Sequence, residues 1–286
     1  MSSGIGAGPV PGVPGAHRRM PGYGGERPRH LPARSQGAPG RPWHHVRMDL
    51  PTLLGEIGDR AAPGPVPSGT WWPLVSLALA LVVVLVSPLW RLLRPAVTIV
   101  HELGHAVTGI LAGRRFTGFV VSADMSGHAI TVGRPRGPGR VISAWSGYPA
   151  PALLGAVLIQ VALVGAAGTA LAVALVALLV SLVFTRSVHT VLAVLGSAAV
   201  VGAVWWLGSP ALVALVTLAV GAFLLMGAWR HVLVVASSGG RGDDPAQLAR
   251  LTPLPAAVWI GSYLLVLAAC TLWALAVLAP GLRELL

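Results

Sequence analysis

The sequence from His101 to His105 reads His-Glu-Leu-Gly-His and places two imidazoles and one carboxylate within five consecutive residues. On an α-helix, residues four positions apart lie on one face, so the side chains of His101 and His105 can converge on one metal ion. Glu102 is turned by about 100° around the helix axis and cannot bind in the same plane. It can instead accept a proton from a water molecule that the ion activates. The motif predicts Zn²⁺ held by His101 and His105, with Glu102 as the catalytic base.

This motif lies within an apolar segment of a chain that carries few charges. Of the 286 residues, 55% are hydrophobic and 10% are charged, whereas a soluble domain carries about 25% charged residues. The composition therefore excludes a soluble globular protein. Histidine and glutamate inside a membrane helix are costly unless they face an interior site, so their position supports a functional centre.

Apolar segments follow one another from Trp71 to the end of the chain, and each is near the roughly 20 residues that cross a bilayer. Because backbone groups in lipid must be paired internally, these segments are expected to be helices. They are 71–90, 92–113, 143–163, 166–185, 188–207, 210–229 and 255–279. We predict an all-α polytopic membrane protein with about seven transmembrane helices, formed by residues 71–286.

The loop after the motif, residues 114–142, is longer than a simple turn requires. It contains two β-prone runs separated by turn residues, which is a hairpin signal. The runs are Phe116–Val121 and His128–Val132, and the turn residues are Asp124, Ser126 and Gly127. We expect a small β-hairpin insertion, to which an unwound substrate segment could add a strand.

Residues 1–70 differ from the rest of the chain, since they contain 14 glycines and 12 prolines. This composition is typical of disorder, so we expect a Pro/Gly/Arg-rich tail that precedes the membrane domain. A start at Met48 would remove most of this tail. The single cysteine, Cys270, excludes an internal disulfide framework and a cysteine-clustered zinc site.

The formal net charge is +11, and all 20 basic residues are arginines. In a membrane protein, arginines that orient the helices explain this excess, so no nucleic-acid partner is expected. With seven crossings, 17 arginines fall on the side of the tail and 3 on the other side. The positive-inside rule then places the N-terminus in the cytoplasm and the C-terminus outside.

Three stretches together resemble a known family. They are Thr98–Gly113 with the His-Glu-Leu-Gly-His motif, Ser146–Gly155 with Ser-Gly-Tyr-Pro-Ala, and Asp243–Trp259 with Asp-Asp-Pro-Ala-Gln. In this order they are similar to the site-2 protease-like membrane zinc metallopeptidases, and to the compact M50B-like branch in particular. The resemblance covers about residues 74–279. It implies a bacterial cell-membrane location, membrane-anchored protein or peptide substrates, and cleavage near the cytoplasmic side.

The resemblance also implies that zinc needs a third protein ligand. In well-studied site-2 proteases this ligand is an aspartate between Asn-Pro and Gly, and that motif is absent from the sequence. Asp244 is the preferred candidate because its place before Pro-Ala-Gln matches the M50B-like branch, and Asp243 and His189 are the next candidates. Alternatively, the Asp pair caps a helix before Pro245, a role compatible with metal binding by the neighbouring carboxylate.

Two other functions are consistent with the residues. A non-catalytic membrane protein could keep the metal cluster for structure or regulation. A transporter could use the buried His/Glu cluster as a proton or metal-ion relay. The oligomeric state and the identity of the substrate are not predicted.

Overall fold

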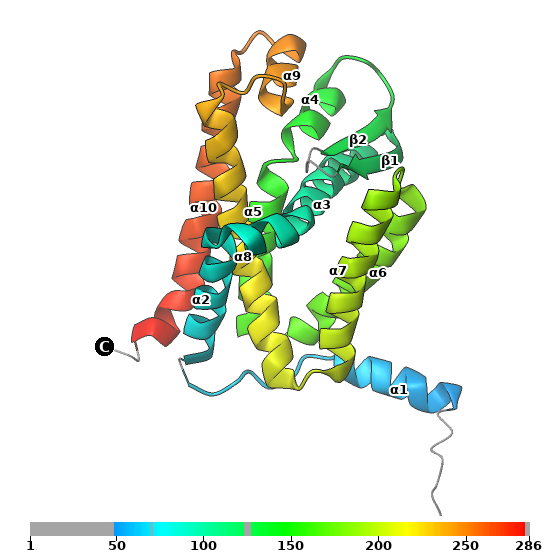
Figure 1. Ribbon diagram of the computed structural model, residues 1–286, viewed down its shortest axis with the longest axis vertical. Coiled ribbons are helices and arrows are strands. Elements are labelled where there is room, and N and C mark those ends of the chain that lie inside the picture. The colour runs from blue at the N-terminus through cyan, green and yellow to red at the C-terminus, as the bar shows by residue number, and fades with distance from the viewer. Residues whose placement is uncertain (1–48, 70, 123–126, 284–286) are drawn as a thin grey trace, which may run out of the picture. The chain divides into compact units, whose positions relative to one another are not determined.

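The computed structural model describes residues 49–69, 71–122 and 127–283, which form helices and one small antiparallel sheet (Figure 1). The elements in chain order are α1 (Leu50–Ala61), α2 (Trp71–Leu85), α3 (Ser87–Leu111), β1 (Arg115–Val121), β2 (Gly127–Val132), α4 (Pro138–Trp145), α5 (Pro149–Leu163), α6 (Ala167–Ser181), the 3₁₀ turn η1 (Leu182–Phe184), α7 (Val188–Leu207), α8 (Pro210–Ser237), α9 (Asp244–Leu251) and α10 (Ala256–Arg283). The helical fold and the hairpin after the His-Glu-Leu-Gly-His helix agree with the sequence-based prediction.

The number of candidate membrane spans differs from the predicted seven. Within the described ranges, four helices are long and apolar enough to cross a membrane, namely α6 with η1, α7, α8 and α10. Two further pairs of helices are long and apolar enough only when the two helices are taken together, and both pairs are bent. The bend is 102° between α2 and α3 and 60° between α4 and α5. The count is therefore four, or up to six if each bent pair crosses once. Hydropathy alone counted α2 and α3 as two crossings because it does not detect the change of direction at Val86.

The break between α2 and α3 fixes the direction of the helix that carries the motif. Pro88 lies in the first turn of α3 and has no N–H to continue the ladder of α2. The Arg230 guanidinium of α8 donates to the carbonyl of Val84, one of the last carbonyls of α2. The same guanidinium lies 4.6 Å from the ring centroid of Trp90 in α3. Arg230 thus contacts both sides of the break and stabilises the bend.

The packed part of the bundle is formed by α2, α5, α8 and α10 (Figure 1). Glycines allow α5 and α8 to approach closely, because a Cβ on Gly155 would lie 2.5 Å from the Gly221 carbonyl oxygen. Of the spans, α8 is the most buried at 61%, whereas 17% of the α6 segment and 22% of α7 and of α10 are buried. Helix α8 is therefore the centre of the bundle, and α6, α7 and α10 leave most of their apolar surface for lipid.

The two ends of this bundle carry different elements. The hairpin, α4 and α9 lie at one end, the upper end in Figure 1, whereas α1, the start of α2 and the end of α10 lie at the other. The start of α2 and the last turn of α10 lie at the same end (Figure 1). The prediction that the two ends of the membrane domain lie on opposite sides depends on an odd number of crossings, and six crossings, one for each bent pair and each long helix, would place them on the same side.

Residues 50–61 are helical, although the sequence predicted an unstructured tail up to residue 70. Asp49 caps α1 by accepting from the Thr52 N–H at 3.1 Å, and Pro51 occupies the first turn. Arg60 joins the helix to the bundle, because it donates to the Trp205 carbonyl at 3.3 Å and pairs with Glu56 at 3.0 Å. Tertiary contacts thus outweigh the Gly/Pro-rich composition here. The predicted tail before Met48 lies outside the described residues, and so does Met48 itself.

Candidate metal centre

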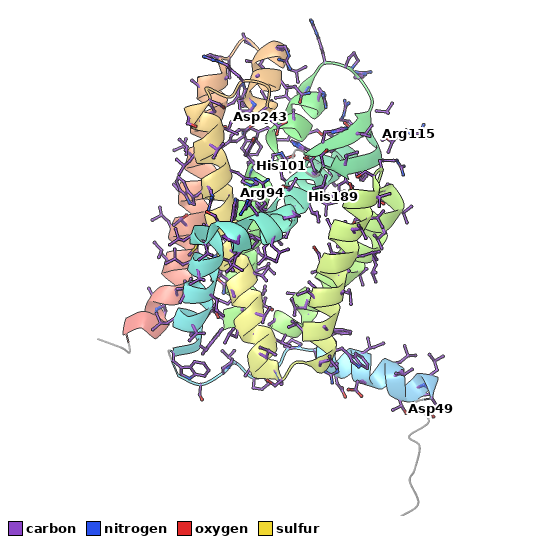
Figure 2. The ribbon with its side chains drawn as sticks, viewed as in Figure 1. Asp49, Arg94, His101, Arg115, His189 and Asp243 are labelled. Atoms are coloured by element: carbon purple, nitrogen blue, oxygen red, sulfur yellow. The ribbon has the colours of Figure 1, made fainter. Side chains whose placement is uncertain are left out.

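Two helices bring three metal-binding side chains together at the hairpin end of the bundle. His101 and His105 project from one face of α3, and their Nε2 atoms lie 3.1 Å apart. Oδ2 of Asp244, the first residue of α9, lies 3.2 Å from His101 Nε2 and 3.1 Å from His105 Nε2. Figure 2 shows His101 and the neighbouring Asp243 at this end of the molecule. The three residues expected to bind metal therefore converge.

The spacing of these three atoms fits a tetrahedral ion. At metal–ligand distances of about 2.0–2.2 Å, two ligand atoms of a tetrahedral zinc lie about 3.4 Å apart. The observed separations of 3.1–3.2 Å are close to that value. Asp244 Oδ2 is buried, and among the described residues its close polar neighbours are the two imidazole Nε2 atoms. A metal ion would bind this oxygen and both imidazole nitrogens at once.

A backbone carbonyl from α4 orients one of the two histidines. His105 Nδ1 lies 2.6 Å from the Ser143 carbonyl oxygen, which can only accept a hydrogen bond. Nδ1 therefore carries the proton, and Nε2 presents its lone pair toward Asp244 and His101. In return, the Ser143 hydroxyl donates to the His105 carbonyl at 2.9 Å. The last turn of α4 thus supports the ligand geometry.

Glycine at position 147 leaves room between the imidazoles. A Cβ there would lie 2.7 Å from His101 Nε2 and 2.5 Å from His105 Cε1, and would also contact His105 Nε2. Tyr148 follows in the same break and packs edge-on against His101, with ring centroids 4.7 Å apart. Gly147 and Tyr148 thus lie in the break at which α4 and α5 meet, with a bend of 60°. The clearance for metal was not visible from the sequence.

Glu102 lies beside the three ligands in a cavity of about 230 Å³. Its side chain is only 2% exposed, and its Oε2 has no hydrogen-bond partner within the described part of the chain. The backbone of β2 comes close, because a Cβ on Gly127 would contact Glu102 Oε1. Arg140, Tyr148 and Gln247 also line the cavity. Glu102 is therefore held next to the predicted metal position, with Oε2 unpaired among the described residues.

The structure separates the alternatives for the third ligand. Asp244 joins the histidines, whereas the neighbouring Asp243 stands at the N-cap of α9, where its side chain makes no cap hydrogen bond. His189 lies at the start of α7, and its Nδ1 is 3.1 Å from the Val121 carbonyl of β1. His128 lines the cavity without joining the three ligands. The geometry therefore favours Asp244 over both Asp243 and His189.

The electrostatic environment keeps Asp244 in its ligating form. Burial raises the pKa of this carboxyl, but the positive charge and hydrogen bonds of His105 and His101 in their protonated forms outweigh burial and lower the pKa below its usual range. Asp244 is therefore ionised at ordinary pH. The two imidazoles must be neutral to bind a metal ion, so metal binding would displace protons from them.

The comparison with protein families agrees with this geometry. A model of the Peptidase M50B-like family matches residues 74–274, which include α3, the hairpin, α5 and Asp244. The chain belongs to the Peptidase M50B-like family. The matched region and the apolar helices make this M50B-like chain an integral membrane protein with a site that can hold a metal ion. Comparisons with curated proteins and with solved structures each gave no match.

Proposed function

We propose that this protein is a zinc-dependent intramembrane endopeptidase of the bacterial cell membrane, which hydrolyses membrane-anchored proteins or peptides near the cytoplasmic side. The observation that carries the proposal is the convergence of His101, His105 and Asp244 beside Glu102. Three protein ligands suit a catalytic zinc, whose fourth position stays open, whereas a structural zinc has four. Zinc, when bound, supplies Lewis acidity that polarises a carbonyl and makes water easier to deprotonate.

Glu102 is the proposed general base. Its buried carboxylate has a free oxygen, Oε2, in the cavity that also holds the ligands. This oxygen can take a proton from the attacking water and return it to the amine that leaves. A carboxylate that served only to hold the helices together would be expected to use both oxygens in hydrogen bonds. The free oxygen therefore favours catalysis over a purely structural cluster.

The hairpin offers a place for the substrate backbone. The outer edge of β1 is already covered, since Phe119 O accepts from the Arg186 N–H at 3.1 Å and the Val121 N–H donates to Thr190 Oγ1 at 2.8 Å. These two residues pair with Ala129 and Gly127 of β2. In an antiparallel ladder, such pairs both turn their N–H and C=O groups outward.

Gly127 and Ala129 also line the cavity of the metal centre, so this edge of β2 lies beside that cavity. Further along β2, the Thr131 carbonyl is not available to a substrate strand, because it accepts from Arg114 Nη2 at 3.4 Å. An extended substrate segment can therefore pair with β2 over a short stretch beside Glu102. This pairing would unwind a substrate helix, which is required before its peptide bonds can be attacked.

The distribution of arginines supports a cytoplasmic position for the metal centre. Eight arginines lie in the connections at its end of the bundle, and only Arg60 and Arg283 lie near the spans at the other end. The eight are Arg114, Arg115, Arg134, Arg136, Arg140, Arg186, Arg241 and Arg250. Arginines within about 15–20 residues of the spans determine orientation, so those up to Arg47 do not count. With six crossings, the start of α2 and the end of α10 would then both face the outside. The C-terminus keeps its predicted side, whereas the start of the membrane domain would not be cytoplasmic.

The substitution Glu102→Gln tests the proposal in purified protein reconstituted with a membrane-anchored reporter peptide. We expect zinc content equal to wild type and a loss of cleavage of at least about 100-fold, the lower range for a general base. Cleavage that persists in Glu102→Gln would contradict the proposal. Wild type that binds zinc and cleaves no reporter, or that moves ions across vesicles, would favour the structural or transport alternatives.

The substitution Ala129→Pro tests substrate pairing, because it removes an outward N–H without removing a bond to β1. Ala129→Ser keeps that N–H and serves as the control. We expect the proline variant to retain zinc and to cleave at least about 10-fold more slowly, with the serine variant near wild type. Equal cleavage by both variants would reject pairing at β2.

A further inference from the structure

A second cavity, of about 350 Å³, lies beside the metal centre at the point where α3 ends and α4 begins. Its volume is within the range of about 300–1,000 Å³ typical of small-molecule sites. Four of its nine lining residues are arginines, namely Arg114, Arg134, Arg136 and Arg140, and three are glycines. We call this the arginine cavity. Arg140 also lines the cavity of the metal centre, so the two share a wall.

The positive charge of the arginine cavity is not compensated by the protein. In the described ranges of the chain, the ion pairs involve Arg60, His101 and His105, and none involves an arginine of this cavity. Arg114 is only 8% exposed. Burial, and then the charge of Arg140, lower the pKa of Arg114. The Arg114 and Arg140 charges repel each other at the wall of the same cavity, and an anion bound there would reduce that repulsion.

The protein holds Arg114 in a fixed position with neutral partners. Its Nη1 donates to the Arg134 carbonyl at 2.7 Å, and its Nε donates to Thr131 Oγ1 at 3.2 Å. The loop closes over it at Gly133, where a Cβ would lie 3.3 Å from Nη1. These bonds place the guanidinium at the wall of the cavity without neutralising it. The site is therefore formed before any ligand binds, which lowers the entropic cost of binding.

The start of α4 adds to the positive potential. Gly137, at φ 110°, adopts a backbone conformation that favours glycine, and α4 begins immediately after it. No side chain caps this N-terminus. Pro138 has no N–H and the Arg140 N–H donates to the Gly137 carbonyl at 3.0 Å, so α4 contributes mainly the positive end of its dipole, which attracts anions. Helix and guanidinium groups thus face the same small volume.

We infer that the arginine cavity binds a ligand with two closely spaced phosphate groups. Arginine recognises phosphate through paired N–H donors, and the four positive charges of the cavity exceed the roughly two negative charges of a single phosphate. Two sources share this chemistry. One is a phospholipid headgroup with two phosphates, since the cavity lies just beyond the last turn of α3, where a span meets the headgroup region. The other is a soluble diphosphate.

The test uses the full-length protein and the double variant Arg134→Gln/Arg136→Gln, in which two exposed lining residues are neutralised. The matched control is Arg115→Gln/Arg241→Gln, which removes the same charge from exposed residues outside the cavity (Figure 2 shows Arg115 on the outer side of the hairpin). Binding of inorganic pyrophosphate is measured by calorimetry in detergent. Retention of cardiolipin is measured by native mass spectrometry after reconstitution in phosphatidylcholine nanodiscs with or without cardiolipin.

We expect at least one of the two probes to bind wild type and the control with equal affinity. The Arg134→Gln/Arg136→Gln variant should bind that probe at least about 10-fold more weakly, because it loses two charged donors. Saturable pyrophosphate binding identifies a soluble source, and cardiolipin retention without pyrophosphate binding identifies a lipid source. If neither probe binds, or both double variants bind equally, the inference is wrong. Neither measurement depends on peptidase activity, so the two proposals can fail separately.

Discussion

Replacing Gly147 with alanine should abolish metal binding while the helices remain folded. The added methyl group would lie 2.5 Å from His105 Cε1 and 2.7 Å from His101 Nε2. Carbon atoms in contact lie about 3.5–4.0 Å apart, so the imidazole of His105 would have to retreat by roughly 1 Å. Metal–ligand distances tolerate changes of about 0.2 Å. The displacement therefore exceeds the tolerance of the site several-fold.

The expected loss of zinc affinity in Gly147→Ala is at least about 100-fold, which is the upper range for removing groups that only support ligands. The cost to stability should stay within about 1–3 kcal/mol, as for other overpacked sites. Gly261→Ala is the matched control, because a Cβ at Gly261 in α10 meets nothing within 4 Å.

The assay is zinc content by mass spectrometry after dialysis against a weak chelator, together with helical circular dichroism and a thermal melt. Gly147→Ala should show wild-type helicity and little zinc, and Gly261→Ala should match wild type in both. A Gly147→Ala protein that keeps zinc at wild-type affinity would refute the argument that the gap at this glycine holds the ion. A Gly147→Ala protein that loses its helicity would contradict the expectation that the clash is confined to the metal site.

Three further predictions follow from contacts elsewhere in the fold. Gly104→Ala should lower the free energy of unfolding by about 1–3 kcal/mol in a denaturant titration, because its Cβ would lie 2.5 Å from Ala150 Cβ, whereas Gly196→Ala should be neutral. Arg60→Ala should increase hydrogen exchange in α1 with little change in the melting temperature of the bundle, and unchanged exchange would show that its bond to Trp205 does not hold α1. A reporter fused to the C-terminus should be found outside, and a cytoplasmic signal would contradict the six-span orientation.

Much of the site was predictable because it depends on local geometry. The spacing of His101 and His105 specifies one helical face wherever the helix lies, and the structure places both side chains together. Asp244 comes from a helix far along the chain, and only the resemblance to the M50B-like branch pointed to it. The choice between Asp243 and Asp244 depends on how α9 begins, which no spacing rule determines.

Other parts of the site are formed by backbone groups, which the identity of the side chains does not reveal. Ser143 orients His105 through its backbone carbonyl, which every residue type possesses. The outward-facing groups of β2 are also backbone, and they are identified by the partners that cover β1. Such contacts follow from the packing of distant elements, so they require a structure.

The fold shows the same division between local and distant causes. The turn at Gly165, at φ 80°, separates α5 from α6 where the sequence predicted a break. The span count failed because length and hydropathy say nothing about the angle between α2 and α3. Helix α1 was missed since composition outweighed the capping signal of Asp49 and the tertiary contact of Arg60.

Zinc content of the purified protein tests the central claim most directly. The account predicts about one zinc ion per chain in wild type, as for a catalytic site with three protein ligands, and little in His105→Ala or Asp244→Ala. Well-folded wild type without zinc would contradict the account, and so would an Asp244→Ala protein that retains the full amount.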